Sequence, residues 1–279
     1  MPVLTGARRR RAKRAITYLL VSFVAAVMAL PVLWLVLLSI RPEQRIFEES
    51  ILPTRVDLSA YGAILTSASF LTPLRNSLLV GASSTALALA LGLPAAYALS
   101  RFRFRGKAPV LVVLIGTKLF PPITLAVGYF VIVASLGLFD SLLSVILMDA
   151  VMTLPLATWM IMNYFDSVPT ELDDAAIVDG CTRLGALLRV VIPVSLPGIA
   201  AAAVYCFVLA WNEFLFALIF LRSAENQLTT VRIAFYLGEF YPEYSRLLAY
   251  GVIFAVPPVV LFLVMQRFLV RGLTSGALR

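Results

Sequence analysis

DSVPTELDDAAIVDGCTRLGALLRVVIPVSLPG, residues 166–198, carries a polar run between two long apolar stretches of the chain. Pro169 suits the first turn of a helix, where its missing N–H is not needed. The acids of ELDD, residues 171–174, follow where the helix dipole favours negative charge. Gly180 then supplies the permissive backbone that ends many helices. The segment therefore predicts a short helix that begins near Pro169 and ends at Gly180.

One face of this predicted helix is narrow and contains small side chains. Residues spaced by three, four and seven positions share a helix face. Here they are Leu172, Ala175, Ala176 and Asp179. The two alanines would let another surface approach closely. An ordinary solvated connector needs only a handful of polar residues, so a structured helix with such a face favours docking to a partner.

A second short helix is expected after the glycine. Thr182 is a suitable N-cap residue, and Pro193 ends the helix because proline cannot continue it. The apolar face of this helix, which is expected to pack beneath the membrane helices, consists of Leu184, Leu187, Leu188 and Val191. The whole segment is therefore expected to form an elbow of two helices joined at a glycine.

The composition of the chain is that of an all-α membrane protein. Of 279 residues, 61% are hydrophobic and 14% are charged, and the mean hydropathy is +0.95, whereas soluble domains carry about 25% charged residues. A helix that crosses the bilayer needs about 20 apolar residues. Six such runs occur, at about 16–40, 76–100, 109–136, 141–165, 194–221 and 248–270. In the third run, the two prolines of KLFPP are expected to kink or break the helix.

The orientation follows from the positive-inside rule, which counts Lys and Arg beside the spans. Most of the 23 Lys and Arg residues lie in RRRRAKR at the N-terminus, in RFRFRGK after the second run, in the elbow and at the C-terminus. We therefore expect both termini in the cytoplasm. The first run is longer than the roughly 7–15 apolar residues of a secretory signal, so it is expected to be a retained span.

The net charge of +8 does not indicate nucleic-acid binding. The basic residues lie at the ends of apolar runs, where they set topology and contact anionic lipid, and no basic domain with interleaved aromatic residues follows them. The two cysteines, Cys181 and Cys206, are separated between the elbow and a span, so a disulfide is not expected. The chain contains no histidine.

The elbow also carries a resemblance to a known family. The run D-A-A-x-x-D-G-C and the following I-P-x-x-x-P-G, within 174–198, closely resemble the EAA loop in the membrane subunits of bacterial ABC importers. Asp174 stands where that loop usually has Glu, and Pro193 stands where the pattern has its proline. RNSLLVG, LPAAYALSRFRFRGK, AWNEFLFAL and RGLTSGALR resemble the carbohydrate-uptake branch, which contains the maltose permease MalG. The resemblance covers nearly the whole chain.

The resemblance implies a type I ABC importer permease fold with six transmembrane helices. It divides the chain into a basic cytoplasmic N-terminus (1–15), a first helix (16–40), an extracytoplasmic loop (41–73), the transmembrane domain proper (74–267, with the elbow at 168–192) and a cytoplasmic tail (268–279). It also makes the first elbow helix the coupling helix that contacts a cytoplasmic ATPase. The coupling residues would be Glu171, Leu172, Asp174, Ala175, Ala176, Asp179 and Gly180.

The resemblance further implies the partners of the chain. They are a second homologous permease, two copies of an ABC ATPase, an extracytoplasmic solute-binding protein and the lipid bilayer of a bacterial cell membrane. The chain has no G-x-x-x-x-G-K-[ST] loop, so it is expected to bind no cofactor and to be no enzyme by itself. ATP and Mg would be held by the partner ATPase. The solute would be a sugar or related polyol, and the sequence does not decide which one.

Polar residues inside the spans are candidates for the solute pathway. Trp211, Asn212 and Glu213 are the first choice, because an aromatic face stacks on sugar rings while amide and carboxylate groups bind hydroxyls. The alternative is that Trp211 packs within the bundle and Asn212 bonds neighbouring helices. Lys118 and Asp149 are further charges in the apolar runs, and their side chains could instead reach the membrane surface.

The sequence disfavours two other classes of protein. A proton-coupled secondary transporter would need a relay of carboxylates or histidines, and Asp149 and Glu213 are the only acids well inside the expected spans. The two halves of the chain also show no inverted repeat, which many such transporters have. An intramembrane metalloenzyme would need a set such as H-E-x-x-H, which is impossible without histidine.

Overall fold

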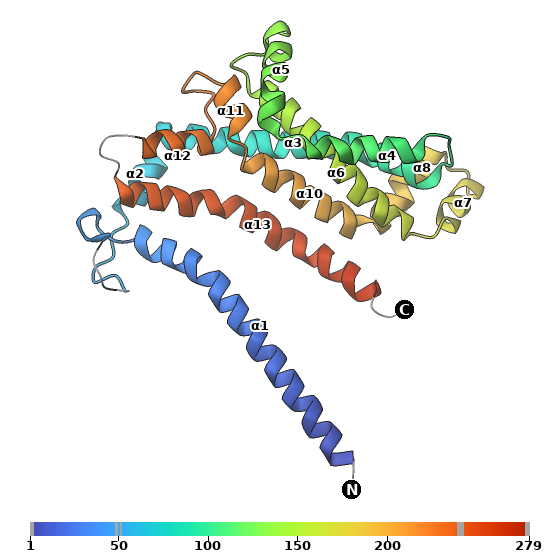
Figure 1. Cartoon of the computed structure of the whole chain (residues 1–279), viewed down its shortest axis with the longest axis horizontal. Coiled ribbons are helices and arrows are strands. Elements are labelled where there is room, and N and C mark those ends of the chain that lie inside the picture. Colours follow the sequence, from blue (N-terminus) through green and yellow to red (C-terminus); the bar gives the residue numbers. More distant parts are fainter. Residues whose placement is uncertain (1–2, 48–49, 51, 239–242, 277–279) are drawn as a thin grey trace. The chain divides into compact units, whose positions relative to one another are not determined.

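The computed structural model describes residues 3–47, 50, 52–238 and 243–276, and every regular element among them is helical. The all-α prediction is therefore confirmed for this part of the chain. The chain divides into two compact units, residues 1–66 with 237–253 and residues 67–236 with 254–279. Figure 1 labels the helices, and each unit is described by itself below.

The first unit contains α1 (Val3–Ser39), the 3₁₀ turn η1 (Glu43–Arg45), α2 (Ser59–Thr66) and the beginning of α13 (Tyr244–Gly276). Helix α13 starts at a carboxylate cap. Glu43 accepts hydrogen bonds from the backbone N–H groups of Tyr244 (3.0 Å) and Ser245 (2.7 Å). These two N–H groups lie in the first turn of α13, where backbone N–H groups have no acceptor within the helix itself. A residue more than 200 positions away in the chain therefore fixes where α13 begins.

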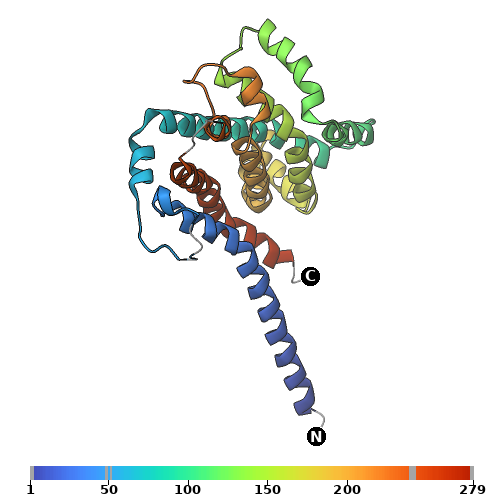
Figure 2. The same ribbon diagram turned by 60° about the vertical axis from the view of Figure 1, so that its left-hand side comes forward.

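The second unit contains the remaining helices. They are α3 (Ala68–Arg101), α4 (Lys107–Gly116), η2 (Thr117–Leu119), α5 (Pro122–Ser135), α6 (Leu142–Asp166), α7 (Glu171–Val178), α8 (Arg183–Ala186), the π-helical turn η3 (Leu187–Val191), α9 (Ile192–Val194), α10 (Leu196–Trp211), α11 (Leu215–Phe220) and α12 (Thr229–Leu237). Figures 1 and 2 show α3, α6 and α10 running side by side.

Close packing of α3, α6 and α10 depends on small residues where the helices meet. A Cβ atom added to Gly81 of α3 would lie 3.1 Å from the ring of Phe207 in α10. One added to Gly92 would lie 3.3 Å from the hydroxyl of Thr158 in α6. Small residues at such contacts are typical of membrane helices, whose association depends on close van der Waals packing.

The helices match the predicted spans in number only in part. Among the residues that the structure describes, four helices are continuous and apolar enough to cross a membrane, and the total rises to six if each of two bent helix pairs is one span. The break predicted at Pro121 and Pro122 is confirmed, because α4 with η2 and α5 meet there at 100°. The prediction of one continuous span over about 194–221 is wrong. Helix α10 ends at Trp211 and α11 begins only at Leu215, because the carboxylate of Glu213, rather than a helical carbonyl, binds the N–H of Phe216 (2.6 Å).

The structure explains why the last position of the I-P-x-x-x-P-G run, residue 198, is a glycine. A Cβ atom at this residue would lie 2.3 Å from Cγ of Tyr164 in α6, so the start of α10 approaches α6 too closely for any side chain. We expect Gly198→Ala to lower the free energy of unfolding by about 1–3 kcal/mol, since overpacking forces neighbouring groups to move. Thermal unfolding of the purified chain in detergent measures the loss. Gly62→Ala is the control, because nothing lies within 4 Å of a Cβ there, and an equal loss in both variants would contradict the steric explanation.

Asp140 joins the loop before α6 to the loop after α11. Its carboxylate accepts hydrogen bonds from the backbone N–H groups of Arg222 (2.9 Å) and Ser223 (3.1 Å), and its own N–H donates to the carbonyl of Phe220 (2.8 Å). Its backbone also has a positive φ of 58°, which side chains other than glycine seldom adopt. Asp and Asn tolerate this conformation best among residues with a side chain.

Two substitutions separate the contributions of the Asp140 carboxylate and its backbone. Both Asp140→Gly and Asp140→Ala remove the carboxylate, but only alanine adds strain at positive φ, roughly 1 kcal/mol. We therefore expect melting temperatures in the order wild type, glycine variant, alanine variant. An alanine variant as stable as the glycine variant would contradict the backbone argument.

The Asp140 carboxylate also predicts a pH dependence. The hydrogen bonds from the N–H groups of Arg222 and Ser223 lower the pKa of Asp140 below its ordinary value. A lowered carboxyl pKa stabilises the folded chain above the unfolded value, about 4, and the stabilisation is lost as the pH falls through the lowered pKa. The difference in melting temperature between the wild type and Asp140→Asn should be constant near neutral pH and shrink below about pH 4.

Candidate functional site

Helix α7 is the first helix of the predicted elbow, and it turns one face inward. Asp173 and Ala176 are buried, whereas Leu172, Ala175 and Val178 are exposed, Val178 to 86%. The small face proposed from the sequence is therefore divided, since Ala176 packs inside while the other three members stay exposed. Asp173 takes the inward position beside Ala176 because residues three apart share a helix face. Figure 1 shows α7 beyond the ends of α3 and α6.

The end of α7 has the glycine cap predicted from the sequence. Gly180 has a positive φ of 88°. Its N–H donates to the carbonyl of Ile177 (3.0 Å), and the N–H of Cys181 donates to the carbonyl of Ala176 (2.9 Å). This pair of bonds is the Schellman motif, in which glycine is favoured because it lacks a Cβ atom. The role of Gly180 as a helix terminator is confirmed.

The second part of the elbow is also capped as predicted. The hydroxyl of Thr182 accepts a hydrogen bond from the N–H of Gly185 (3.1 Å). The predicted apolar face is only half buried: Leu187 and Val191 are in the core, while Leu184 and Leu188 are exposed. The turn over 187–191 is π-helical rather than α-helical, so leucines spaced for an α-helix do not all point to the same side.

A buried polar cluster joins α7 to the ends of α3 and α6. The guanidinium of Arg101, the last residue of α3, donates through Nε to Asp173 (2.9 Å), and the two side chains are only 6% and 8% exposed. The other carboxylate oxygen of Asp173 accepts from the hydroxyl of Tyr97 (2.7 Å). The two terminal nitrogens of Arg101 donate to the carbonyls of Phe165 and Val168 (3.0 Å each). The Arg101 side chain therefore binds the end of α6, the loop after it and the start of α7, which follow one another in the chain.

A second polar site lies where two broken helices meet the middle of α6. A cavity of about 540 Å³ is lined by the break between η2 and α5, by the break between α10 and α11, and by α6. The polar residues that line it are Thr117, Lys118, Asp149, Thr153, Asn212 and Glu213. The volume is in the range of sites for small molecules, roughly 300–1,000 Å³. Non-helical backbone at membrane depth is tolerated where it borders protein or a cavity.

Asp149 is the most deeply buried charge of this cavity. The residue is only 3% exposed, so its side chain does not reach the membrane surface, as the sequence had allowed. No protein group meets the geometry of a hydrogen bond to its atom Oδ2 among the described residues, but its carboxyl group lies next to that of Glu213 and interacts with it. A buried carboxylate without full pairing destabilises a fold. Asp149 is therefore a candidate functional residue of this cavity.

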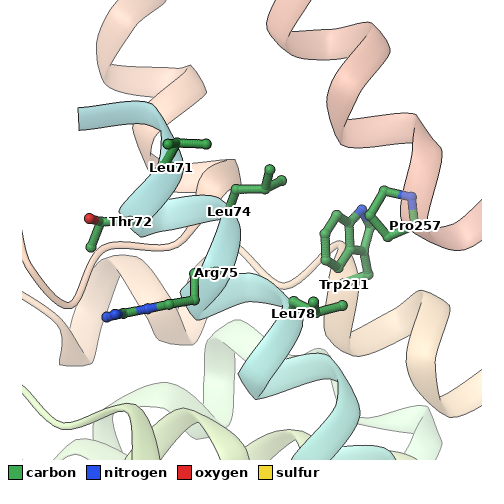
Figure 3. Close-up of a pocket in the computed structure, with 7 residues that line it drawn as sticks. All are labelled: Leu71, Thr72, Leu74, Arg75, Leu78, Trp211 and Pro257. Atoms are coloured by element: carbon green, nitrogen blue, oxygen red, sulfur yellow. The ribbon is translucent and has the colours of Figure 1, made fainter. Parts of the chain in front are cut away.

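The three pathway residues chosen from the sequence lie in different places. Trp211 is buried between the rings of Phe207 and Phe254 and donates its indole N–H to the carbonyl of Phe254 (3.1 Å). This arrangement favours the packing alternative for Trp211. Figure 3 shows its ring beside Pro257 at a separate cavity of about 450 Å³. Asn212 and Glu213 instead line the cavity at the helix breaks, and the Asn212 amide donates within its own helix, to the carbonyl of Val208 (2.7 Å).

The sequence matches one known family over almost its whole length. The family is described as binding-protein-dependent transport system inner membrane component, and the match covers residues 2–275. The chain belongs to this family. As a member, it is an inner-membrane permease of the ABC transporter type, and the elbow of α7 to η3 is the loop that suggested the family from the sequence.

Relatives of this permease carry sugar-transport names. The sulfoquinovosyl glycerol permease SmoH of Agrobacterium fabrum is 36% identical over 254 residues, which are 89% of this chain and 88% of the relative. The trehalose permease SugB of Mycobacterium tuberculosis is 33% identical over 276 residues, 98% of this chain and 99% of the relative. A chain from the crystal structure of a bacterial ABC transporter for alginate shares the fold, with a TM-score of 0.77 and 23% identity over 93% of this permease and 97% of that chain.

Two buried charged residues of the permease, Arg101 and Asp149, are not among the coupling or pathway residues predicted from the sequence. Arg101 was counted only as one of the basic residues that set topology, and its burial depends on Asp173, which lies 72 positions away. Asp149 was noticed as a charge in an apolar run, but its neighbours in the cavity come from two other segments. A charged residue within an apolar run was the available signal for Asp149, whereas nothing local distinguished Arg101 from the arginines that follow it.

Proposed function

We propose that this chain is one of two permease subunits in an importer for a sugar or related polyol, driven by ATP hydrolysis on separate subunits. It would span the membrane six times with both termini in the cytoplasm. The observation that carries the proposal is the elbow: α7 ends in a glycine cap, presents Leu172, Ala175 and Asp179 outward, and is fixed from behind by Arg101. The sugar-permease names of the relatives support the solute class.

In this mechanism the elbow transmits force. Glu171, Leu172, Asp174 and Ala175 would fit a cleft of the ATPase, which holds ATP and Mg, and closure of two ATPase subunits would displace the elbows. A second homologous permease would complete the solute path, and an extracytoplasmic binding protein would deliver the solute. Asn212 and Glu213 would face the solute in the cavity at the helix breaks, and Trp211 would shape the bundle beside it.

The proposal is tested by uptake into proteoliposomes that contain the chain with its own partner permease, ATPase and binding protein. The solute is first found by a thermal-shift panel of sugars on the binding protein. We expect uptake to require ATP on the side of the membrane where the ATPase is bound. An uncoupler, which removes the proton gradient, should leave this uptake unchanged. Uptake that continues without the ATPase and collapses with the uncoupler would support the alternative, a proton-coupled secondary transporter.

A further inference from the structure

One buried arginine makes most of the polar contacts between the elbow and the spans. Arg101 reaches Asp173 at the start of α7 through Nε, and reaches the carbonyls of Phe165 and Val168 through its two terminal nitrogens. The Phe165 carbonyl lies in the last turn of α6 and also accepts a hydrogen bond from the N–H of Val168 (3.0 Å), and the Val168 carbonyl lies just beyond that end. The positive guanidinium therefore lies at the negative end of one helix dipole, and the Asp173 carboxylate lies at the positive end of another.

The contacts among Arg101, Asp173 and Tyr97 leave α7 little freedom to move against α3. Arg101 and Asp173 are 6% and 8% exposed, so water does not weaken their attraction as it does at a surface. The second oxygen of Asp173 is held by the hydroxyl of Tyr97, one helical turn before Arg101 on α3. The planar guanidinium donates in fixed directions, which a lysine ammonium does not. Two turns of α3 thus hold α7 through both oxygens of one carboxylate.

A parallel contact supports the same connection from the second elbow helix. The guanidinium of Arg183, the first residue of α8, lies over the ring of Phe102, 5.1 Å from its centroid. Leu187 and Val191 of η3 are fully in the apolar core with Ile161 and Phe165 of α6. The elbow is therefore attached to α3 and α6 on both sides of Gly180, and the glycine itself is not a hinge between the elbow and the spans.

We propose that Arg101 is the positioning residue that makes α7 move as one body with α3 and α6, so that a displacement of the elbow reaches the spans without loss. This inference rests on the proposed docking of α7 to an ATPase. It predicts that the distance between α7 and the end of α3 is the same whether or not the ATPase has bound nucleotide. Without the guanidinium, α7 could shift against α3, and ATP hydrolysis would no longer be linked to movement of the spans.

The test measures that distance directly. Spin labels are placed at Val178 on α7 and at Arg105 beyond the end of α3, two exposed positions, in a complex whose Cys181 and Cys206 are replaced by serine. Pulsed electron spin resonance then gives the label distance without nucleotide and with ATP and vanadate. We expect one narrow distance in both states for the wild type. In Arg101→Gln we expect a broader distribution that changes with nucleotide, together with loss of the ATPase stimulation that the binding protein produces.

Controls separate positioning from folding and from the proposed function. Arg103→Gln removes an exposed arginine two positions away and should leave both readouts unchanged. Arg101→Lys, which keeps the charge without the planar fork, should fall between Arg101→Gln and the wild type. If Arg101→Gln does not assemble into the complex, the label distance and the ATPase stimulation are measured on Arg101→Lys and Asp173→Asn instead. Both variants should then show a broader distance distribution and weaker stimulation than the wild type.

The possible results are distinct. A wild-type distance that changes with nucleotide, or an Arg101→Gln variant with the wild-type distance and normal ATPase stimulation, overturns the inference. Failure of any ATPase to purify with the wild-type chain would instead contradict the proposed function, and it would be seen before any label is introduced. A purely structural role for Arg101 would lower the amount of complex but leave the ATPase stimulation per complex unchanged, and that result also overturns the inference.

Discussion

Ala175→Arg is expected to lower ATP-driven uptake at least about tenfold while leaving the chain in the membrane. Ala175 is exposed on α7, so a long side chain there does not disturb the core of the bundle. The arginine would instead clash with the wall of the ATPase cleft into which α7 is proposed to fit. A change at the centre of an interface can cost about 2 kcal/mol or more, which corresponds to roughly thirtyfold in binding. The measurement is uptake per amount of assembled permease.

Ala175→Ser is the matched control, because it adds one polar atom and little volume; it should transport normally. Gly180→Asp is a second variant, in which a charged side chain is placed on a backbone with a φ of 88°. It should also reduce uptake, since a displaced cap changes the end of α7. Normal uptake by Ala175→Arg, with the ATPase still bound, would sink the docking hypothesis for α7.

Asp149→Leu is expected to make the permease more stable and yet lower its uptake about tenfold or more. The carboxyl group is buried beside another acid, Glu213, so an apolar side chain of similar size should be neutral or stabilising, because it removes a buried polar group and its interaction with a second acid. Uptake should fall because a solute hydroxyl that loses the carboxyl group of Asp149 is left buried without a hydrogen-bond partner, which costs about 1–3 kcal/mol, on the order of tenfold in affinity. Melting temperature and uptake are measured on the same preparation.

Ser84→Ala is the control for this prediction. The Ser84 hydroxyl is also buried without a hydrogen-bond partner among the described residues, but it does not line the cavity at the helix breaks. Its removal should leave uptake unchanged. If Asp149→Leu unfolded the chain, the carboxylate would be a structural group, and if it transported normally the cavity would have no part in the solute path.

Local signals in the sequence were sufficient for the elbow and for one helix break. Gly180 and Thr182 cap helices in the structure as they were expected to, because capping depends on residues within four positions along the chain. The break at Pro121 and Pro122 was predicted for the same reason, since proline itself removes the helical hydrogen bond. The break after Trp211 has no proline, so the apolar run alone gave no warning of it.

The sequence by itself determined that this chain is an all-α membrane protein with an elbow of two capped helices, because composition and short-range spacing control both. Only the tertiary structure decided which side of α7 faces inward, why Arg101 is buried, and which residues share a cavity with Asp149. The physical reason is that these features depend on groups that are brought together by packing, such as Arg101 and Asp173 across 72 positions. The free energy of such a contact is absent from any single segment of the chain.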